Sequence, residues 1–300
     1  MKITTFFSYK GGSGRSTTCF NTLPFLATYL GASKDYPILL IDMDIESAGM
    51  TYLLNQQDKF AGKEDVKTII KNELRWSTGR CPNLNEHPFY KYLVPVGNIL
   101  GLDDDYAVMF LGVDDKTAQL SRSDIVGDPE QAMNNVMEFA SNNLFRAVIM
   151  DSAAGDQLSA NLAINSSDNL VVCMKMTRQF RVGTFNYLRR FALKNSMVAS
   201  AINVILLPTV VPPNTVIDGE AQFETSIEDI ASRINELNEK FDVNIKTNFV
   251  ADKERFGINE VIRFKWKEEV LFKLNKNNVS LSDDEKRAFR QYESLSKLIG

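Results

Sequence analysis

Short apolar runs alternate along the chain with longer segments whose apolar residues recur every three or four positions. The short runs predict strands, and most of them lack the polar alternation of a half-exposed strand, which is typical of strands covered on both faces. The predicted strands are residues 3–7, 38–41, 92–95, 147–150, 169–174, 202–207 and 245–250. The predicted helices are residues 17–30, 65–76, 129–142, 181–194 and 225–240. This alternation predicts an α/β fold, a doubly wound and mostly parallel sheet with helices on both faces.

The same pattern favours one domain over residues 1–300, because no Pro-, Gly- or Ser-rich linker and no internal repeat divides the chain. Two segments interrupt the alternation. Residues 77–90 are polar with turn formers, and residues 101–128 are acidic and irregular. We expect both to be insertions on the rim of the sheet.

The last helix is expected at residues 282–299, where Ser-Asp-Asp-Glu places acidic side chains at the positive end of the helix dipole. One apolar stripe follows, made of Phe289, Tyr292, Leu295 and Ile299. The polar face is mixed in sign, not basic, so packing on the sheet is favoured over binding to a membrane surface.

Composition describes an ordinary folded protein, with 44% hydrophobic and 24% charged residues and a net charge of -4. No apolar stretch approaches the roughly 20 residues that cross a bilayer, and no secretion signal is evident, so a cytoplasmic location is expected. The chain has three widely spaced cysteines, which predict reduced thiols and neither a disulfide framework nor a CxxC metal site.

The first candidate for chemistry is the run of residues 9–17, YKGGSGRST, between the first predicted strand and the first predicted helix. A phosphate chain needs close backbone approach, which glycine allows, and N–H groups converging at a helix start. Gly11, Gly12 and Gly14 meet the first requirement. Ser16 at the helix start is then placed to ligate a magnesium ion. We assign Ser13 and Thr17 to the same nucleotide site.

This run departs from the usual GxxxxGK pattern twice, with Tyr9 for the first glycine and Arg15 for the lysine. Because Lys10 is present, it resembles the deviant Walker A motif of the ParA/MinD family of P-loop ATPases, in its KGGxGR variant. The resemblance implies ATP as ligand and a homodimer in which Lys10 reaches the phosphates bound by the opposite subunit. Arg15 would still bind phosphate, but a guanidinium is not equivalent to an ammonium there, so the hydrolysis rate is left open.

The second predicted strand ends in Asp42-Met43-Asp44, at the sheet edge where ligands collect in doubly wound folds. This run resembles the DxD segment of the same family. The resemblance implies that Asp44 is catalytic and orients the attacking water, as phosphoryl transfer requires, while Asp42 supports the magnesium shell. Glu46 has no assigned role.

Two later segments complete the resemblance. The predicted strand 147–150 ends in Asp151-Ser-Ala-Ala-Gly155, similar to the DSPAG segment of MinD-like proteins. The resemblance implies that Asp151 holds the metal through water and that the Gly155 amide senses the γ-phosphate. Members of the family often read adenine with an Asn after a later strand. Here the run is Leu-Leu-Pro-Thr, so Pro208 is assigned to the nucleotide site and ATP follows from the family.

Two clusters of basic residues and one histidine are weaker signals. The basic residues are Arg178, Arg181, Arg189, Arg190 and Lys194, and further on Arg263, Lys265 and Lys267. They are expected either to form a solvated helix face or to bind DNA nonspecifically, as ParA-like proteins do. His87 is the only histidine and lies far in sequence from the motifs, which gives little support to a catalytic triad.

Three function classes remain open. The first is an ATPase switch that dimerises around ATP and magnesium to recruit or position a protein partner. The second is a metabolic enzyme on the same fold, either an ATP-dependent ligase, which would lack Lys10, or an iron–sulfur reductase, which scattered cysteines fit poorly. The third is a nucleotide-binding scaffold with little or no hydrolysis, which Arg15 keeps open.

Overall fold

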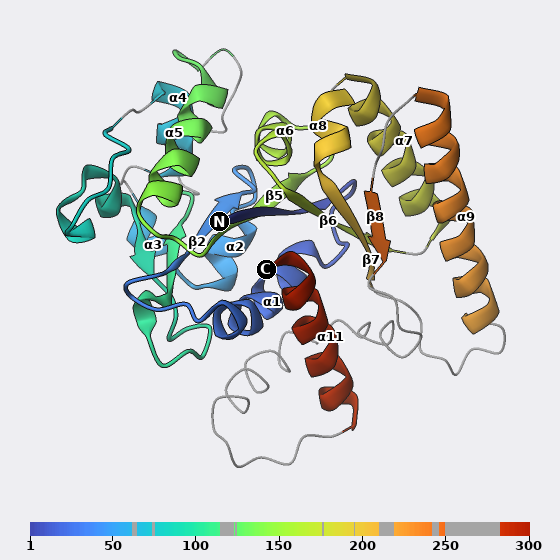
Figure 1. Ribbon diagram of the computed structural model, residues 1–300, viewed down its shortest axis with the longest axis horizontal. Coiled ribbons are helices and arrows are strands. Elements are labelled where there is room, and N and C mark those ends of the chain that lie inside the picture. The colour runs from blue at the N-terminus through green and yellow to red at the C-terminus, as the bar shows by residue number, and fades with distance from the viewer. Residues whose placement is uncertain are drawn as a thin grey trace.

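The computed structural model describes residues 1–61, 65–73, 76–114, 123, 125–175, 177–194, 196–209, 219–241, 246–249 and 283–300. Within this part of the chain, eight strands form one sheet (Figure 1) in the order β3-β4-β2-β5-β1-β6-β7-β8. The strands are β1 (Lys2–Ser8), β2 (Ile38–Met43), β3 (Val94–Pro95), β4 (Val108–Leu111), β5 (Ala147–Ala154), β6 (Asn169–Lys175), β7 (Asn203–Thr209) and β8 (Lys246–Phe249). Every neighbouring pair is parallel except β3 and β4. The predicted α/β class is confirmed.

Helices cover both faces of this sheet (Figure 1). One face carries α1 (Arg15–Leu30), α2 (Gly49–Leu53), α3 (Gln57–Phe60) and α11 (Asp283–Ile299). The other carries α4 (Val66–Asn72), α5 (Pro129–Asn142), α6 (Leu158–Asn165), α7 (Arg178–Lys194), α8 (Ser196–Ala201) and α9 (Gly219–Phe241). Short 3-10 turns are η1 (Leu84–Glu86), η2 (Pro88–Tyr92) and η3 (Asp105–Ala107).

The central strands are largely apolar because both of their faces are buried. In β2, Leu40 faces the α1 side of the sheet, whereas Leu39 and Ile41 face the side of α4 and α5. Successive side chains of a strand point to opposite faces, so a strand between two helical layers has no solvent-facing position to fill with polar residues. Each such side chain contributes about 1.5–3 kcal/mol when fully buried.

One sequence prediction is wrong for the middle of the segment that it describes. Residues 101–128 were expected to be an irregular rim insertion, yet Val108–Leu111 form β4, which pairs in parallel with β2. The run Val-Met-Phe-Leu is a short continuous apolar strand, and the acidic residues before it obscure the signal. Residues 115–122 and 124 of that segment lie outside the described part of the chain, as does the basic cluster at residues 263–267.

Element boundaries also differ from the prediction. Helix α1 begins two residues early and α7 three residues early, so both start closer to the strands that precede them. Helix α4 ends at Asn72, short of Trp76. His87 is buried and accepts a hydrogen bond from the Phe89 amide, with its ring 4.4 Å from that of Phe139, so it has a structural role.

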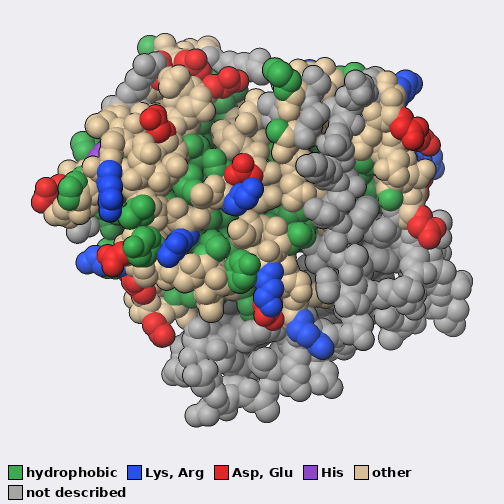
Figure 2. Space-filling model, viewed as in Figure 1, with side chains coloured by type: hydrophobic (Ala, Val, Ile, Leu, Met, Phe, Trp, Pro, Cys, Tyr) green, Lys and Arg blue, Asp and Glu red, His purple; other side chains and the backbone are tan. Residues whose placement is uncertain are grey.

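The C-terminal helix packs as its apolar stripe predicts. Tyr292, Leu295 and Ile299 are buried against α1 and the sheet, and the Tyr292 hydroxyl accepts a 3.0 Å hydrogen bond from Asn21. The side chain of Phe289 lies outside the described residues. None of the described helices is long and apolar enough to cross a membrane. On the face shown in Figure 2, acidic and basic side chains of the described residues are interspersed and form no patch of one sign.

Candidate nucleotide-binding site

The loop that joins β1 to α1 holds its shape through glycines at positive φ. Gly12 has φ 74° and Gly14 has φ 77°, a conformation that side-chain-bearing residues rarely adopt. Gly14 is the N-cap residue of α1, and no side chain caps the helix. The first N–H groups of α1 are therefore left for another acceptor, and the positive end of its dipole favours an anion there.

The backbone of this loop is open to solvent. Gly11 and Gly12 are exposed, and a Cβ atom added at Gly11 or Gly14 would meet no atom within 4 Å. Ser13 is buried between them, and its hydroxyl has no hydrogen-bond partner among the described residues. An orphaned buried hydroxyl beside exposed amides is a donor without an acceptor, which a phosphate oxygen would supply.

Two carboxylates meet on neighbouring strands beneath the start of α1. Asp42 of β2 is in register with Asp151 of β5, and both side chains are buried on the face that α1 covers. Burial, together with the neighbouring Asp151 charge, raises the pKa of Asp42 to about 8. Burial also raises the pKa of Asp151, although Arg15 acts against that rise. Such a pair of buried acids requires a cation nearby.

Arg15 supplies that cation as the first residue of α1. Its Nε donates to Asp151 Oδ1 at 2.8 Å, and its Nη2 donates to Asp44 Oδ2 at 2.7 Å. The Arg15 side chain is only 7% exposed. Burial lowers the pKa of this guanidinium, but attraction to Asp151 and Asp44 outweighs it and the pKa is raised. One planar fork thus joins a carboxylate of strand β5 to one in the loop after β2, which a single ammonium group could not do in the same geometry.

The oxygen donors in this corner fit a hard divalent cation. Asp151 Oδ2 is buried and has no hydrogen-bond partner among the described residues. The Ser16 hydroxyl lies close by, accepting a 3.2 Å hydrogen bond from Arg15 Nη2. A hydroxyl and one or two carboxylates, together with substrate phosphates, are the ligands that Mg²⁺ takes in nucleotide sites. Asp42 is already engaged, because Thr51 donates to it twice, each time at 2.8 Å.

The other residues that were assigned to the nucleotide site from the sequence make no contact that indicates a role in binding. Lys10 is half-buried and makes no hydrogen bond or ion pair with a described residue, and Thr17 is half-buried on the first turn of α1. The Gly155 amide donates to the Ser8 carbonyl at 2.9 Å, so a phosphate would have to displace that bond. Pro208 lies in β7, two strands from β1, and its side chain is outside the described residues.

The structure adds a cation that the sequence motifs do not include. Lys175 ends β6, the strand next to β1, and its Nζ lies 3.9 Å from the position of a Cβ added at Gly12. It is the first basic residue after the apolar run 170–174, which is the signal that could have identified it. Lys175 therefore brings an ammonium group close to Gly12 of the loop.

Two further contacts tie the loop to its neighbours. Tyr9 packs against α7 at Gly183. A Cβ added at Gly183 would lie only 2.2 Å from a ring atom of Tyr9, so the contact requires glycine there. Exposed Glu46 accepts a 3.3 Å hydrogen bond from Gln157, which joins the loops that follow β2 and β5. The sequence left Glu46 without a role, and the structure gives it this link between the two acidic segments.

The cysteines are unsuited to a shared metal cluster. Cys19 and Cys173 are fully buried, and burial raises the pKa of the Cys173 thiol to about 12. Cys81 is half-exposed in a separate loop, where its Sγ donates to the Asn83 carbonyl. A cluster that bridges two subunits needs thiolates at the surface, and this donor set does not provide them.

No protein-family model matches the chain, and no curated protein matches it in sequence. Solved structures do match. MinD, a cell division ATPase of Pyrococcus furiosus, is 16% identical with a TM-score of 0.56, over 99% of each chain. A putative plasmid partition protein of Borrelia burgdorferi bound to AMPPNP is 17% identical with a TM-score of 0.53, over 99% of each chain. Cobyrinic acid a,c-diamide synthase of Mycobacterium smegmatis, with ADP and magnesium, is 16% identical with a TM-score of 0.58, over 92% of this chain and 96% of that one.

Proposed function

We propose that this chain, which has the fold of MinD and of plasmid partition ATPases, is an ATP-binding switch that dimerises around Mg-ATP and hydrolyses it slowly. The dimer would recruit or position a protein partner. One observation carries the proposal. The glycine loop before α1 brings the first residue of that helix, Arg15, onto Asp151 of β5 and onto Asp44, which directly follows the neighbouring strand β2.

In the proposed mechanism, the amides of residues 11–16 bind the phosphates, and Lys10 and Lys175 add positive charge. Ser16 and Asp151 would hold Mg²⁺, which neutralises charge on the phosphates when it is bound. Asp44 would orient the attacking water. Because Arg15 holds Asp44 at 2.7 Å, the guanidinium has to turn away from that carboxylate before the water can be oriented. This exchange of partners would make turnover slow.

A scaffold that binds nucleotide without hydrolysing it is the second candidate. It is favoured by the same ion pair, since a guanidinium that stays on Asp44 would leave no group to orient water. The fold shared with cobyrinic acid a,c-diamide synthase is compatible with a metabolic role. Lys10 favours the switch, because the early lysine is part of the deviant Walker A motif that residues 9–17 resemble.

Calorimetry on the full chain tests nucleotide binding directly. Mg-ATP and Mg-ADP are expected to bind with dissociation constants between about 1 µM and 1 mM, the usual range for substrates of such enzymes. Adenosine, which has no phosphate, is expected to give no heat, and EDTA is expected to weaken the binding of ATP. A titration with Mg-GTP measures base specificity. If no magnesium nucleotide produces heat with folded protein, the proposed function is wrong.

Lys10→Ala is expected to prevent the ATP-dependent dimer while the monomer stays folded, because Lys10 has no structural partner among the described residues. Light scattering coupled to size-exclusion chromatography, with a non-hydrolysable ATP analogue, measures the mass. The matched control is Lys34→Ala. Lys34 is exposed and precedes β2, so it lies at the N-terminal ends of the strands, opposite the phosphate loop. A dimer that forms equally in both variants would remove the cross-subunit role of Lys10.

A further inference from the structure

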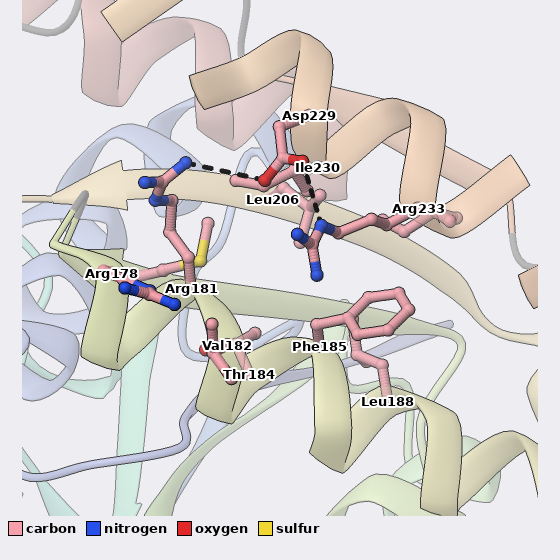
Figure 3. Close-up of a pocket in the computed structure, with 12 residues that line it drawn as sticks. Arg178, Arg181, Val182, Thr184, Phe185, Leu188, Leu206, Asp229, Ile230 and Arg233 are labelled. Carbon is pink, nitrogen blue, oxygen red and sulfur yellow. Dashed lines mark hydrogen bonds and ion pairs between the residues drawn. The ribbon is translucent and has the colours of Figure 1, made fainter. Parts of the chain in front are cut away.

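A cavity lies between α7, α9 and the sheet (Figure 3). Its volume is about 250 Å³, enough for a small ligand. The floor is apolar and comes from the two helices and from β6 and β7, with Met174, Phe185, Leu188, Leu206, Ile230 and Ile234. An apolar hollow of this kind binds the hydrocarbon part of a ligand.

The wall of the cavity carries an excess of positive charge. Its lining includes three guanidinium groups, those of Arg178, Arg181 and Arg233, and a single carboxylate, that of Asp229. Arg233 pairs with Asp229 at 2.9 Å and Arg181 pairs with it at 3.6 Å, as Figure 3 shows by dashed lines. Arg178 makes no ion pair or hydrogen bond with a described residue. Two positive charges are thus left for an anion.

Buried polar atoms in the same wall also lack partners. Thr184 is only 2% exposed, and its hydroxyl has no hydrogen-bond partner among the described residues. The Nε of Arg181 is likewise buried and unsatisfied. Leaving a buried donor unpaired is costly, so each such group calls for an acceptor. An anionic head group that enters the cavity would satisfy both.

We infer that this cavity binds a small amphiphilic anion, an acyl chain or ring that carries one carboxylate or phosphate group. Guanidinium forks bind either oxyanion in a bidentate manner, while the apolar floor takes the rest of the ligand. Arg178 and Arg233 are exposed at the rim of the cavity, but phosphate contacts along a duplex would leave its apolar floor empty, so nucleic acid fits these features less well. The exposed Arg189 and Arg190 of α7 do not line the cavity.

The test titrates the full chain, without nucleotide, with octanoate and with octyl phosphate, and measures heat. At least one of the two is expected to bind roughly 10-fold or more tightly than either inorganic phosphate or 1-octanol, which each supply one half of the ligand. The phosphate loop is also empty in this titration, so binding is assigned to the cavity by its response to Arg178→Ala, which leaves that loop unchanged.

Arg178→Ala is expected to weaken that binding roughly 10-fold, since it removes a charged donor, and Thr184→Val removes the hydroxyl at nearly constant volume and weakens it less. Arg190→Ala, on the same helix but outside the cavity, is the matched control and is expected to change nothing. The inference is overturned if neither amphiphile binds, if inorganic phosphate binds as tightly, or if Arg178→Ala has no effect. It is also overturned if only a DNA duplex binds and Arg178→Ala weakens that complex.

Discussion

Replacing Arg15 with alanine is expected to destabilise the protein by about 3 kcal/mol at neutral pH, because it removes the cation from between two buried carboxylates. Asp44 and Asp151 would then repel each other or take up protons, and either outcome costs free energy. For a domain of this size the midpoint of thermal unfolding should fall by roughly 5–10 °C. Circular dichroism during heating of the ligand-free protein measures the change.

Arg15→Lys separates loss of charge from loss of geometry. A lysine keeps the positive charge but presents one ammonium group, so it can hold only one of the two carboxylates well. Its unfolding midpoint is expected to lie between those of Arg15→Ala and the unchanged protein. If Arg15→Ala unfolds at the same temperature as the unchanged protein, the bridge contributes nothing and the account of the site must be revised.

Replacing Asp44 with alanine is expected to lower the rate of ATP hydrolysis about 100-fold or more, because a water that is not oriented attacks the γ-phosphate slowly. Arg15 keeps its 2.8 Å pair with Asp151 in this variant, so the loop should still bind nucleotide. Phosphate release under saturating Mg-ATP measures the rate, and calorimetry measures binding. The ATP-bound dimer is expected to persist.

Glu46→Gln is the matched control, since Glu46 is an exposed carboxylate two residues further along the same loop. Its rate is expected to equal that of the unchanged protein. Equal rates in the Asp44→Ala variant and the unchanged protein would show that Asp44 is wrongly assigned. If the unchanged protein also shows no turnover while binding ATP, the scaffold candidate replaces the switch.

Sequence reasoning predicted the fold well where a strand is both apolar and bounded by turn formers, as at residues 38–41. It missed β4 because four apolar residues after an acidic segment give too short a signal. It also placed residues 101–128 wholly on the rim, although β4 lies inside the sheet beside β2. The position of a short strand depends on its partners, which a local pattern does not contain.

For the site, the sequence predicted which residues converge but not how they pair. Arg15 was expected to bind phosphate, and its ion pairs with Asp44 and Asp151 depend on the register of β2 and β5, which local sequence does not specify. Lys175 and the cavity beside α7 were missed for a similar reason. Each depends on a strand or helix lying beside a loop that is distant in sequence.

The contact between Tyr9 and Gly183 packs the first residue of the phosphate loop directly against α7. Because Gly183 has no side chain, the ring of Tyr9 lies directly against the helix backbone, so a shift of α7 would displace Tyr9. Two of the three arginines that line the cavity, Arg178 and Arg181, lie on this same helix. Occupancy of one site should therefore change the affinity of the other, and by thermodynamic linkage the influence runs equally in both directions.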